Sequence, residues 1–189
     1  MIRLFRPDEK AISEALARVS GGPLSYDTPG MTRRAPEPGW PVNQIRTALG
    51  RGSQVWERAV GALERWEQYH TDWTTLAPPE PALIPGTNFA ALGRHYGFWS
   101  VNCCRVVYGP EDAGSDGLYA YAIGTLDDHS ESGEERFLIE RDDDETVWFE
   151  LVAYARARHP LGRLAPPLVT RVQRKFARDA AAAMKRAVR

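Results

Sequence analysis

Cysteine is scarce in this chain: its 189 residues include only Cys103 and Cys104, which are adjacent. Small secreted scaffolds are usually held by about two to four disulfide bridges, so the pair excludes that class. Neighbouring residues on a strand point to opposite faces, and we therefore expect two reduced thiols, one facing inward and one outward. A metal or redox site needs further Cys or His ligands at usable spacing, which the sequence lacks. We expect neither a metal nor a cofactor.

Other missing sequence features exclude further classes of protein. No apolar run approaches the roughly 18 residues of a transmembrane helix. The first 18 residues carry Asp8, Glu9 and Glu14 and lack the apolar centre of a signal peptide. No G-x-S-x-G motif is present, and the Gly50-Arg51-Gly52 turn lacks the lysine of a P-loop. These absences predict a cytoplasmic protein without a membrane span, a serine-hydrolase site or a nucleotide loop.

Charge is nearly balanced overall, at −1, but it is distributed unevenly. Residues 127–150 carry a net charge of −9, and residues 156–189 carry +9. The simplest interpretation is that the basic C-terminal segment lies near the acidic one. Compensated positive charge argues against a nucleic-acid partner, since nucleic-acid-binding proteins usually show an uncompensated basic surface.

A long helix without Gly or Pro is predicted at the C-terminus, starting at Pro166 or Pro167. Apolar residues recur there at spacings of three and four, which is typical of a helix with one buried face. They are Leu168, Val172, Phe176, Ala180, Ala183 and Ala187. Because this stripe shrinks toward alanine, we expect close packing at the C-terminal half. Room for a ligand is expected near the N-terminal half, beside Leu164, Leu168 and Val172.

The rest of the chain predicts a sheet for this helix to lie on. A helix is expected at 7–19, an irregular segment pinned by Tyr26 and Trp40 at 24–40, a strand at 42–49, and a helix capped by Ser53 at 54–69. Period-two patterns then predict six strands, at 71–76, 87–96, 98–108, 118–126, 134–141 and 146–156. Helices segregated from a run of antiparallel strands indicate an α+β fold. A curved antiparallel sheet of about seven strands would wrap around the C-terminal helix and leave a cavity between them.

This order of elements resembles the helix-grip architecture of the START and Bet v 1 superfamily. We expect residues 42–189 to form that domain as a single globular unit, with residues 1–41 as a helix-and-loop extension packed on it. The oligomeric state cannot be read from the sequence.

Several short motifs together resemble one family, the domain of unknown function 1990 family, also called uncharacterised protein family 0548. The motifs run in order from about Leu24 to Arg189. They are W-E-R-A at 56–59, A-L-E-R-W at 62–66, D-W-T at 72–74, C-R-V-V-Y at 104–108, G-T-L at 124–126, His129, G-E-E-R-F at 133–137, V-W-F-E at 147–150, and the tail from His159 through Phe176 to Arg178. Asp128 stands where the family usually has glycine. Membership implies a fold rather than a reaction.

Glu135, Glu150 and His129 are the candidates for acid–base chemistry. Strand 134–141 is expected to turn Phe137, Ile139 and Glu135 inward. For strand 146–156, periodicity allows two registers. One buries Val147, Phe149, Leu151 and Ala153, and the other buries Trp148, Glu150, Val152 and Tyr154. Under the second register, Glu135 and Glu150 would face one cavity, and an apolar site would raise at least one pKa.

Aromatic residues on the strands are candidates for lining the cavity, since Tyr and Trp combine an apolar body with a polar group. The predicted ligand-binding residues are Trp99, Tyr119, Tyr121, Glu135, Trp148, Tyr154, Leu164, Leu168 and Val172. Three functions follow as hypotheses. The first is a binder of a small apolar or amphipathic molecule. The second is an enzyme resembling the cyclase, dehydratase or hydrolase members of the superfamily. The third is an interaction module that uses basic residues such as Arg171, Arg174, Arg178 and Lys185.

Overall fold

A computed structural model describes residues 2–110, 117–158 and 166–189. Its helices are α1 (Glu9–Val19), α2 (Ser53–Glu64) and α4 (Pro166–Ala187), with two short 3-10 helices, η1 (Met31–Arg33) and η2 (Glu67–Tyr69). Its strands are β1 (Ile2–Arg3), β2 (Val42–Arg51), β3 (Thr74–Ala77), β4 (Asn88–His95), β5 (Phe98–Tyr108), β6 (Leu118–Thr125), β7 (Glu131–Arg141) and β8 (Thr146–Ala157). The expected order of helix, loop, strand, helix, six strands and long helix is confirmed, with β1 as an unforeseen addition.

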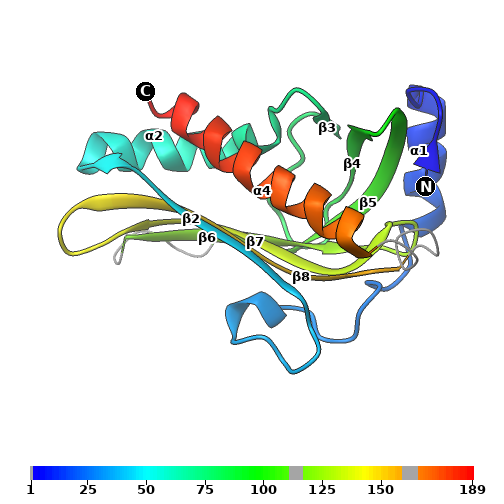
Figure 1. Cartoon of the computed structure of the whole chain (residues 1–189), viewed down its shortest axis with the longest axis horizontal. Coiled ribbons are helices and arrows are strands. Elements are labelled where there is room, and N and C mark those ends of the chain that lie inside the picture. Colours follow the sequence, from blue (N-terminus) through cyan, green and yellow to red (C-terminus); the bar gives the residue numbers. More distant parts are fainter. Residues whose placement is uncertain (1, 111–116, 159–165) are drawn as a thin grey trace.

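All of these strands belong to one antiparallel sheet. Seven of them follow the order β2-β8-β7-β6-β5-β4-β3, and β1 pairs with Trp99 and Ser100 at the start of β5. The sheet curls, and α4 crosses its concave face, with α2 on the same side (Figure 1). This is the helix-grip arrangement, and the prediction of an α+β fold with a curved sheet around a long C-terminal helix is confirmed.

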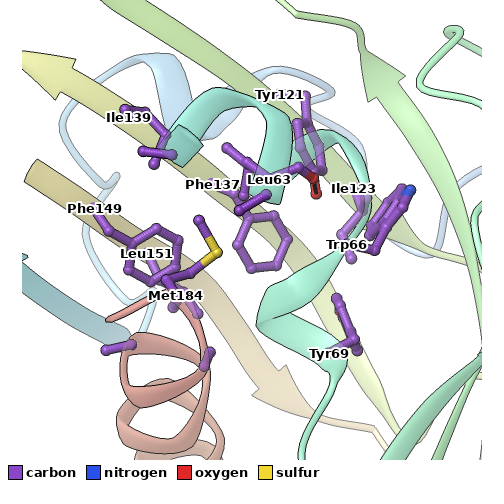
Figure 2. Close-up of a cluster of buried hydrophobic side chains, with 14 of the residues drawn as sticks. Leu63, Trp66, Tyr69, Tyr121, Ile123, Phe137, Ile139, Phe149, Leu151 and Met184 are labelled. Atoms are coloured by element: carbon purple, nitrogen blue, oxygen red, sulfur yellow. Dashed lines mark hydrogen bonds between the residues drawn. The ribbon is translucent and has the colours of Figure 1, made fainter. Parts of the chain in front are cut away.

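The main hydrophobic core fills the end of this space where α2 and the C-terminal half of α4 meet the sheet. Phe137 and Ile139 from β7 and Phe149 and Leu151 from β8 point toward the helices, and all four are fully buried (Figure 2). Small residues let α4 come close to these large side chains. The buried residues of α4 are Ala177, Ala180, Ala181, Ala183 and Met184.

Strand β8 takes the first of the two registers that its sequence allows. Its inward side chains are Val147, Phe149, Leu151 and Ala153, which belong to the main core. Its outward side chains include Val152 and Tyr154, which are also buried because the N-terminal loop covers them. Tyr26 and Met31 of that loop pack on this outer face, and Trp40 lies beside them.

Helix α1 lies against the outer side of β4 and β5, where Ala15 and Val19 pack on Leu92, Val101 and Cys103. The neighbouring thiol, Cys104, belongs to the main core on the other side of the sheet. The two cysteines therefore point to opposite faces as expected, and both are free and buried.

The predicted N-cap of the second helix is wrong. Helix α2 is preceded by Gly52, whose φ of 86° is in the left-handed region that favours glycine, and Ser53 is the first helical residue rather than the N-cap. Helix α4 meets the acidic segment at Glu131, whose Oε1 accepts a hydrogen bond from Gln173 at 2.8 Å. Within the described residues, however, no ion pair joins α4 to residues 127–150.

The acidic side chains pair with arginines elsewhere in the chain. Asp128 pairs with Arg18, Glu140 and Glu150 share Arg46, Asp144 pairs with Arg51, and Asp127 pairs with Arg158. Arg171, Arg174, Arg178 and Lys185 of α4 are exposed. Within the described segments, no helix combines the length and the apolar composition needed to span a bilayer.

Candidate functional site

A cavity of about 410 Å³ lies between the sheet and the N-terminal half of α4. Leu168, Val169, Val172, Gln173 and Phe176 contribute its helical wall. The floor comes from the inner face of β4 to β8. The cavity thus begins where the alanine-rich part of α4 ends, at the position that the shrinking apolar stripe predicted for an open space.

Small side chains on the sheet create this space. Several inward positions at this end carry small side chains, and those that line the cavity are Ala91, Gly93, Ser100, Gly133, Ala153 and Ala155. At the other end, β7 and β8 present Phe137, Ile139, Phe149 and Leu151. Because the sheet side chains shrink where α4 carries its larger residues, the two layers fill one half of the interface and leave the other half open.

Two carboxyl groups on β7 face this cavity, Glu131 and Glu135, with Gly133 between them. Gln173 of α4 donates its amide to Glu131 Oε1 at 2.8 Å, and the Tyr69 hydroxyl donates to Glu135 Oε2 at 3.4 Å. Burial raises the pKa of Glu131 to about 7. Burial, reinforced by the charge of Glu131, raises the pKa of Glu135 to about 8. Both groups therefore exchange protons near neutral pH.

His129 lines the same cavity from the turn before β7, and its Nδ1 accepts a hydrogen bond from the Glu131 backbone N–H at 2.9 Å. Burial lowers the pKa of His129 to about 3, so its imidazole is neutral at pH 7. His95 lines the cavity from the end of β4, and burial lowers its pKa as well. Its Nδ1 is buried and has no hydrogen-bond partner among the described residues.

Aromatic rings form one wall of the cavity. Phe176 packs against Tyr69 with ring centroids 5.0 Å apart and against Trp73 at 6.2 Å. Trp73 in turn meets His95 edge-on at 6.1 Å. The Trp73 indole is fixed by its Nε1, which donates to Asp179 of α4 at 2.7 Å. The rings thus tie α4 to the segment between η2 and β3 and hold the wall in place.

Glu150 does not share the cavity with Glu135. Glu135 is paired with Ala153 across the β7–β8 ladder, whereas Glu150 points to the outer face and pairs with Arg46 at 3.2 Å. The second register, under which both carboxyls would face one cavity, is therefore wrong, because β8 adopts the register that turns Glu150 outward. Of the three acid–base candidates, the structure brings together Glu135 and His129.

The predicted ligand-binding residues divide into three groups. Glu135, Leu168 and Val172 line the cavity. Tyr119 and Tyr121 face inward but belong to the filled core under α2, where their hydroxyls donate to Glu64 at 3.1 Å and to the Leu63 carbonyl at 3.4 Å.

Trp99, Trp148 and Tyr154 lie on the outer side of the sheet and do not line the cavity. Trp99 packs near α1, Trp148 donates from Nε1 to Asp142 at 2.8 Å, and Tyr154 donates to the Arg34 carbonyl at 3.0 Å. Leu164 lies outside the described residues.

Glu131, Gln173, Tyr69 and Trp73 were missed as cavity residues. The predicted strand begins at residue 134 and leaves Glu131 outside it, but β7 begins at Glu131. The alternation that turns Glu135 inward, continued backward, places Gly133 and Glu131 on the same face. Gln173 follows Val169 by four residues and precedes Phe176 by three, so helical spacing likewise places it beside the apolar stripe.

Comparison with known proteins agrees with this architecture. The family model described as "Domain of unknown function (DUF1990)" matches residues 25–183. The chain belongs to this family. A UPF0548 protein of Deinococcus radiodurans is 36% identical over 198 residues, covering 97% of this chain and 98% of the relative. A UPF0548 protein of Dictyostelium discoideum is 32% identical and covers 78% of this chain and 72% of the relative.

Solved structures with low sequence identity share the fold. TTHA0849 from Thermus thermophilus superposes with a TM-score of 0.57 at 13% identity, over 78% of this chain and 97% of that one. Ara h 8.0201 superposes with a TM-score of 0.50 at 13% identity, over 79% and 98%. These neighbours support the helix-grip fold, a curved antiparallel sheet around a long C-terminal helix.

The G-E-E-R-F motif of this DUF1990 member has a clear structural meaning. A Cβ on Gly133 would lie 1.9 Å from the Tyr154 carbonyl oxygen, so only glycine allows β7 and β8 to approach here. Glu134 turns outward and holds the N-terminal loop, Glu135 turns into the cavity, and Phe137 enters the core. The motif therefore joins the outer loop, the sheet and the cavity.

Proposed function

We propose that this protein binds a small apolar or amphipathic molecule in the cavity between the sheet and the N-terminal half of α4. The observation that carries the proposal is the cavity itself, about 410 Å³ and lined mainly by apolar and aromatic side chains with a few polar groups on its floor. Pockets for small molecules have this composition and typically measure roughly 300–1,000 Å³. The opposing size gradients of sheet and helix support a cavity built into the fold.

A ligand screen with a cavity-filling variant tests the proposal. The full chain is incubated with a panel of apolar and amphipathic molecules, and binding is followed by thermal shift and native mass spectrometry. Val172→Trp places a large ring into the cavity and is expected to abolish the shift. Val42→Trp is the matched control, because Val42 is 49% exposed on the outer face of β2. Equal binding by both variants would place the ligand elsewhere.

Acid–base catalysis on the bound molecule is a second candidate function. It is favoured by the pKa values of Glu131 and Glu135, which burial raises to about 7 and about 8, close to the optimum for proton transfer at neutral pH. Under this hypothesis Glu131, rather than Glu150, is the second carboxyl group of the acid–base pair with Glu135. Glu135→Gln should then abolish turnover of a neutral cavity ligand while leaving its binding intact. Unchanged turnover in that variant would exclude this role.

A further inference from the structure

We infer that the molecule held in this cavity carries a positively charged nitrogen at its polar end. This inference rests on the proposed function and specifies the ligand as an amphipathic amine rather than a fatty acid or a neutral lipid. It follows from the charge of the cavity, the unused hydrogen-bond capacity of its carboxyl groups, and the aromatic wall beside them.

The charge of the cavity has one sign. Among the described residues that line it, there is no Lys or Arg, and the acidic residues are Glu131, Glu134 and Glu135. Glu134 directs its carboxyl group to the outer face, where it accepts hydrogen bonds from Tyr26 and Thr32. The two carboxyl groups that face the interior therefore have no basic side chain of the described chain to neutralise them. A cationic ligand supplies that missing charge.

Each of the two carboxyl groups also keeps an oxygen available. Gln173 donates to Oε1 of Glu131, and Tyr69 donates to Oε2 of Glu135. In the described part of the chain, the second oxygen of each group accepts no hydrogen bond. Both present donors are neutral. An ammonium group carries up to three N–H donors, so it can bond to the available oxygen of either carboxyl group, whereas a ligand carboxylate has no donor to offer them and would oppose their ionisation.

The aromatic wall suits the same ligand. The Tyr69 hydroxyl bonds to Glu135 and its ring packs at a tilt against Phe176, so the ring cluster begins at the acidic floor. Trp73 continues the cluster, and its outer side already holds a cation, since Lys175 Nζ lies 4.7 Å from the ring centroid. The Tyr69 hydroxyl links the ring cluster to Glu135, so a nitrogen bound at that carboxyl group would lie at the edge of the aromatic wall, while the apolar body of the ligand would contact Val172 and Phe176.

The other titratable groups of the cavity do not counter this charge. The pKa values of His129 and His95 are lowered by burial, so both imidazoles are neutral at pH 7. Burial raises the pKa of Tyr69 and of Cys104, which also stay neutral. A cation near Glu131 and Glu135 favours their charged forms, so binding of an amine should release protons from the protein near neutral pH.

Three probes with one naphthalene body test the inference: 2-naphthylmethylamine, 2-naphthylmethanol and 2-naphthoate. Their affinities for the full chain are measured by isothermal titration calorimetry. Hydrogen bonds to charged groups predict that the amine binds at least about tenfold more tightly than the alcohol. The carboxylate should bind most weakly. Repeating the amine titration in buffers of different ionisation enthalpy should show the proton release.

Variants identify the groups responsible. Glu135→Gln and Glu131→Gln should each reduce the preference for the amine over the alcohol by about tenfold while keeping alcohol binding. Glu150→Gln is the control on the opposite face and should keep the full preference. Equal affinity for amine and alcohol, or tighter binding of the carboxylate, overturns the inference but leaves a ligand-binding cavity. If no probe and no member of the wider panel binds, both the inference and the proposed function fail.

Discussion

Glu134 and Glu135 are adjacent in the chain, but β7 directs their carboxyl groups to opposite faces of the sheet. Glu134 is 1% exposed and accepts four hydrogen bonds of 2.5 to 2.9 Å from the N-terminal loop. The donors are the Tyr26 hydroxyl, the Thr32 hydroxyl and the backbone N–H groups of Gly30 and Thr32. Glu135 has one long hydrogen bond and faces an apolar cavity. One carboxyl group therefore holds the structure together, and its neighbour is available for a ligand.

Replacing Glu134 tests the first of these roles. Glu134→Gln leaves an amide that cannot accept all four donors, and we expect a loss of about 2–4 kcal/mol in the free energy of unfolding. Hydrogen exchange should rise in residues 26–34 before it rises in the sheet. The control is Glu150→Gln, which breaks an ion pair with the half-exposed Arg46 and should cost about 1 kcal/mol or less. An unchanged loop in Glu134→Gln would contradict this role.

The pKa of Glu135 predicts a specific pH dependence of stability. Its folded-state pKa is raised to about 8 from an ordinary value of 4.5, so the unfolded state loses its proton first as the pH rises. The stability linked to this group is complete below pH 4.5 and is lost progressively up to pH 8. The slope reaches at most about 1.4 kcal/mol per pH unit.

Urea denaturation of the wild type and Glu135→Gln between pH 4.5 and 8 measures this effect. The variant cannot ionise at this position, so its stability should fall less steeply over that window. Glu131, with a pKa of about 7, still contributes a smaller decline in both proteins. Parallel curves for the two proteins would show that Glu135 has an ordinary pKa.

At the scale of elements, α4 has two halves with different tasks. Ala180 is fully buried against the core, whereas Leu168 is 44% exposed at the edge of the cavity. Ala180→Leu should therefore overpack the interface and cost about 1–3 kcal/mol. Leu168→Ala should change stability by less than about 0.5 kcal/mol, as exposed positions do. Thermal and urea denaturation compare the two, and similar costs would mean that α4 packs uniformly along its length.

Some element boundaries were predictable from the sequence, but the start of β7 and the face of β8 were not. The long helix begins at Pro166, one of its two predicted starts, and β5 spans the predicted Phe98–Tyr108. Strand β8 has apolar residues on both faces because the N-terminal loop covers Val152 and Tyr154 on the outside. Alternation of apolar and polar residues identifies the buried face of a strand only when the other face is exposed to water. The direction of the Glu150 side chain therefore depends on the tertiary structure.

The cavity was predictable only in part for a similar reason. The shrinking stripe of α4 indicated which half of the helix leaves room, since that gradient lies within one element. The matching gradient on the sheet is spread over Ala91, Ser100, Gly133 and Ala153, which come from four different strands. Their common location depends on the strand register, and so the aromatic residues Trp99, Trp148 and Tyr154 were expected in the cavity although they lie outside it.

At the scale of the whole molecule, the fold divides the space between sheet and helices into a filled half and an open half. The filled half, with Phe137, Phe149 and Met184 at its centre, supplies the stability of the domain (Figure 2). The open half carries the acidic floor and the aromatic wall. Because the two halves share α4 and the same strands, a ligand in the open half can be held by elements that the core keeps rigid.

The most direct test of ligand binding in this cavity is an NMR titration of the full, ¹⁵N-labelled chain with 2-naphthylmethanol, whose neutral hydroxyl makes the result independent of the preference for an amine. Our account predicts that amide shifts change in residues 131–135 of β7 and residues 168–176 of α4. The amides of residues 180–188, and those of the N-terminal loop on the outer face, should remain in place. Saturable shifts confined to the outer face, or shifts spread evenly over both halves of α4, would contradict it.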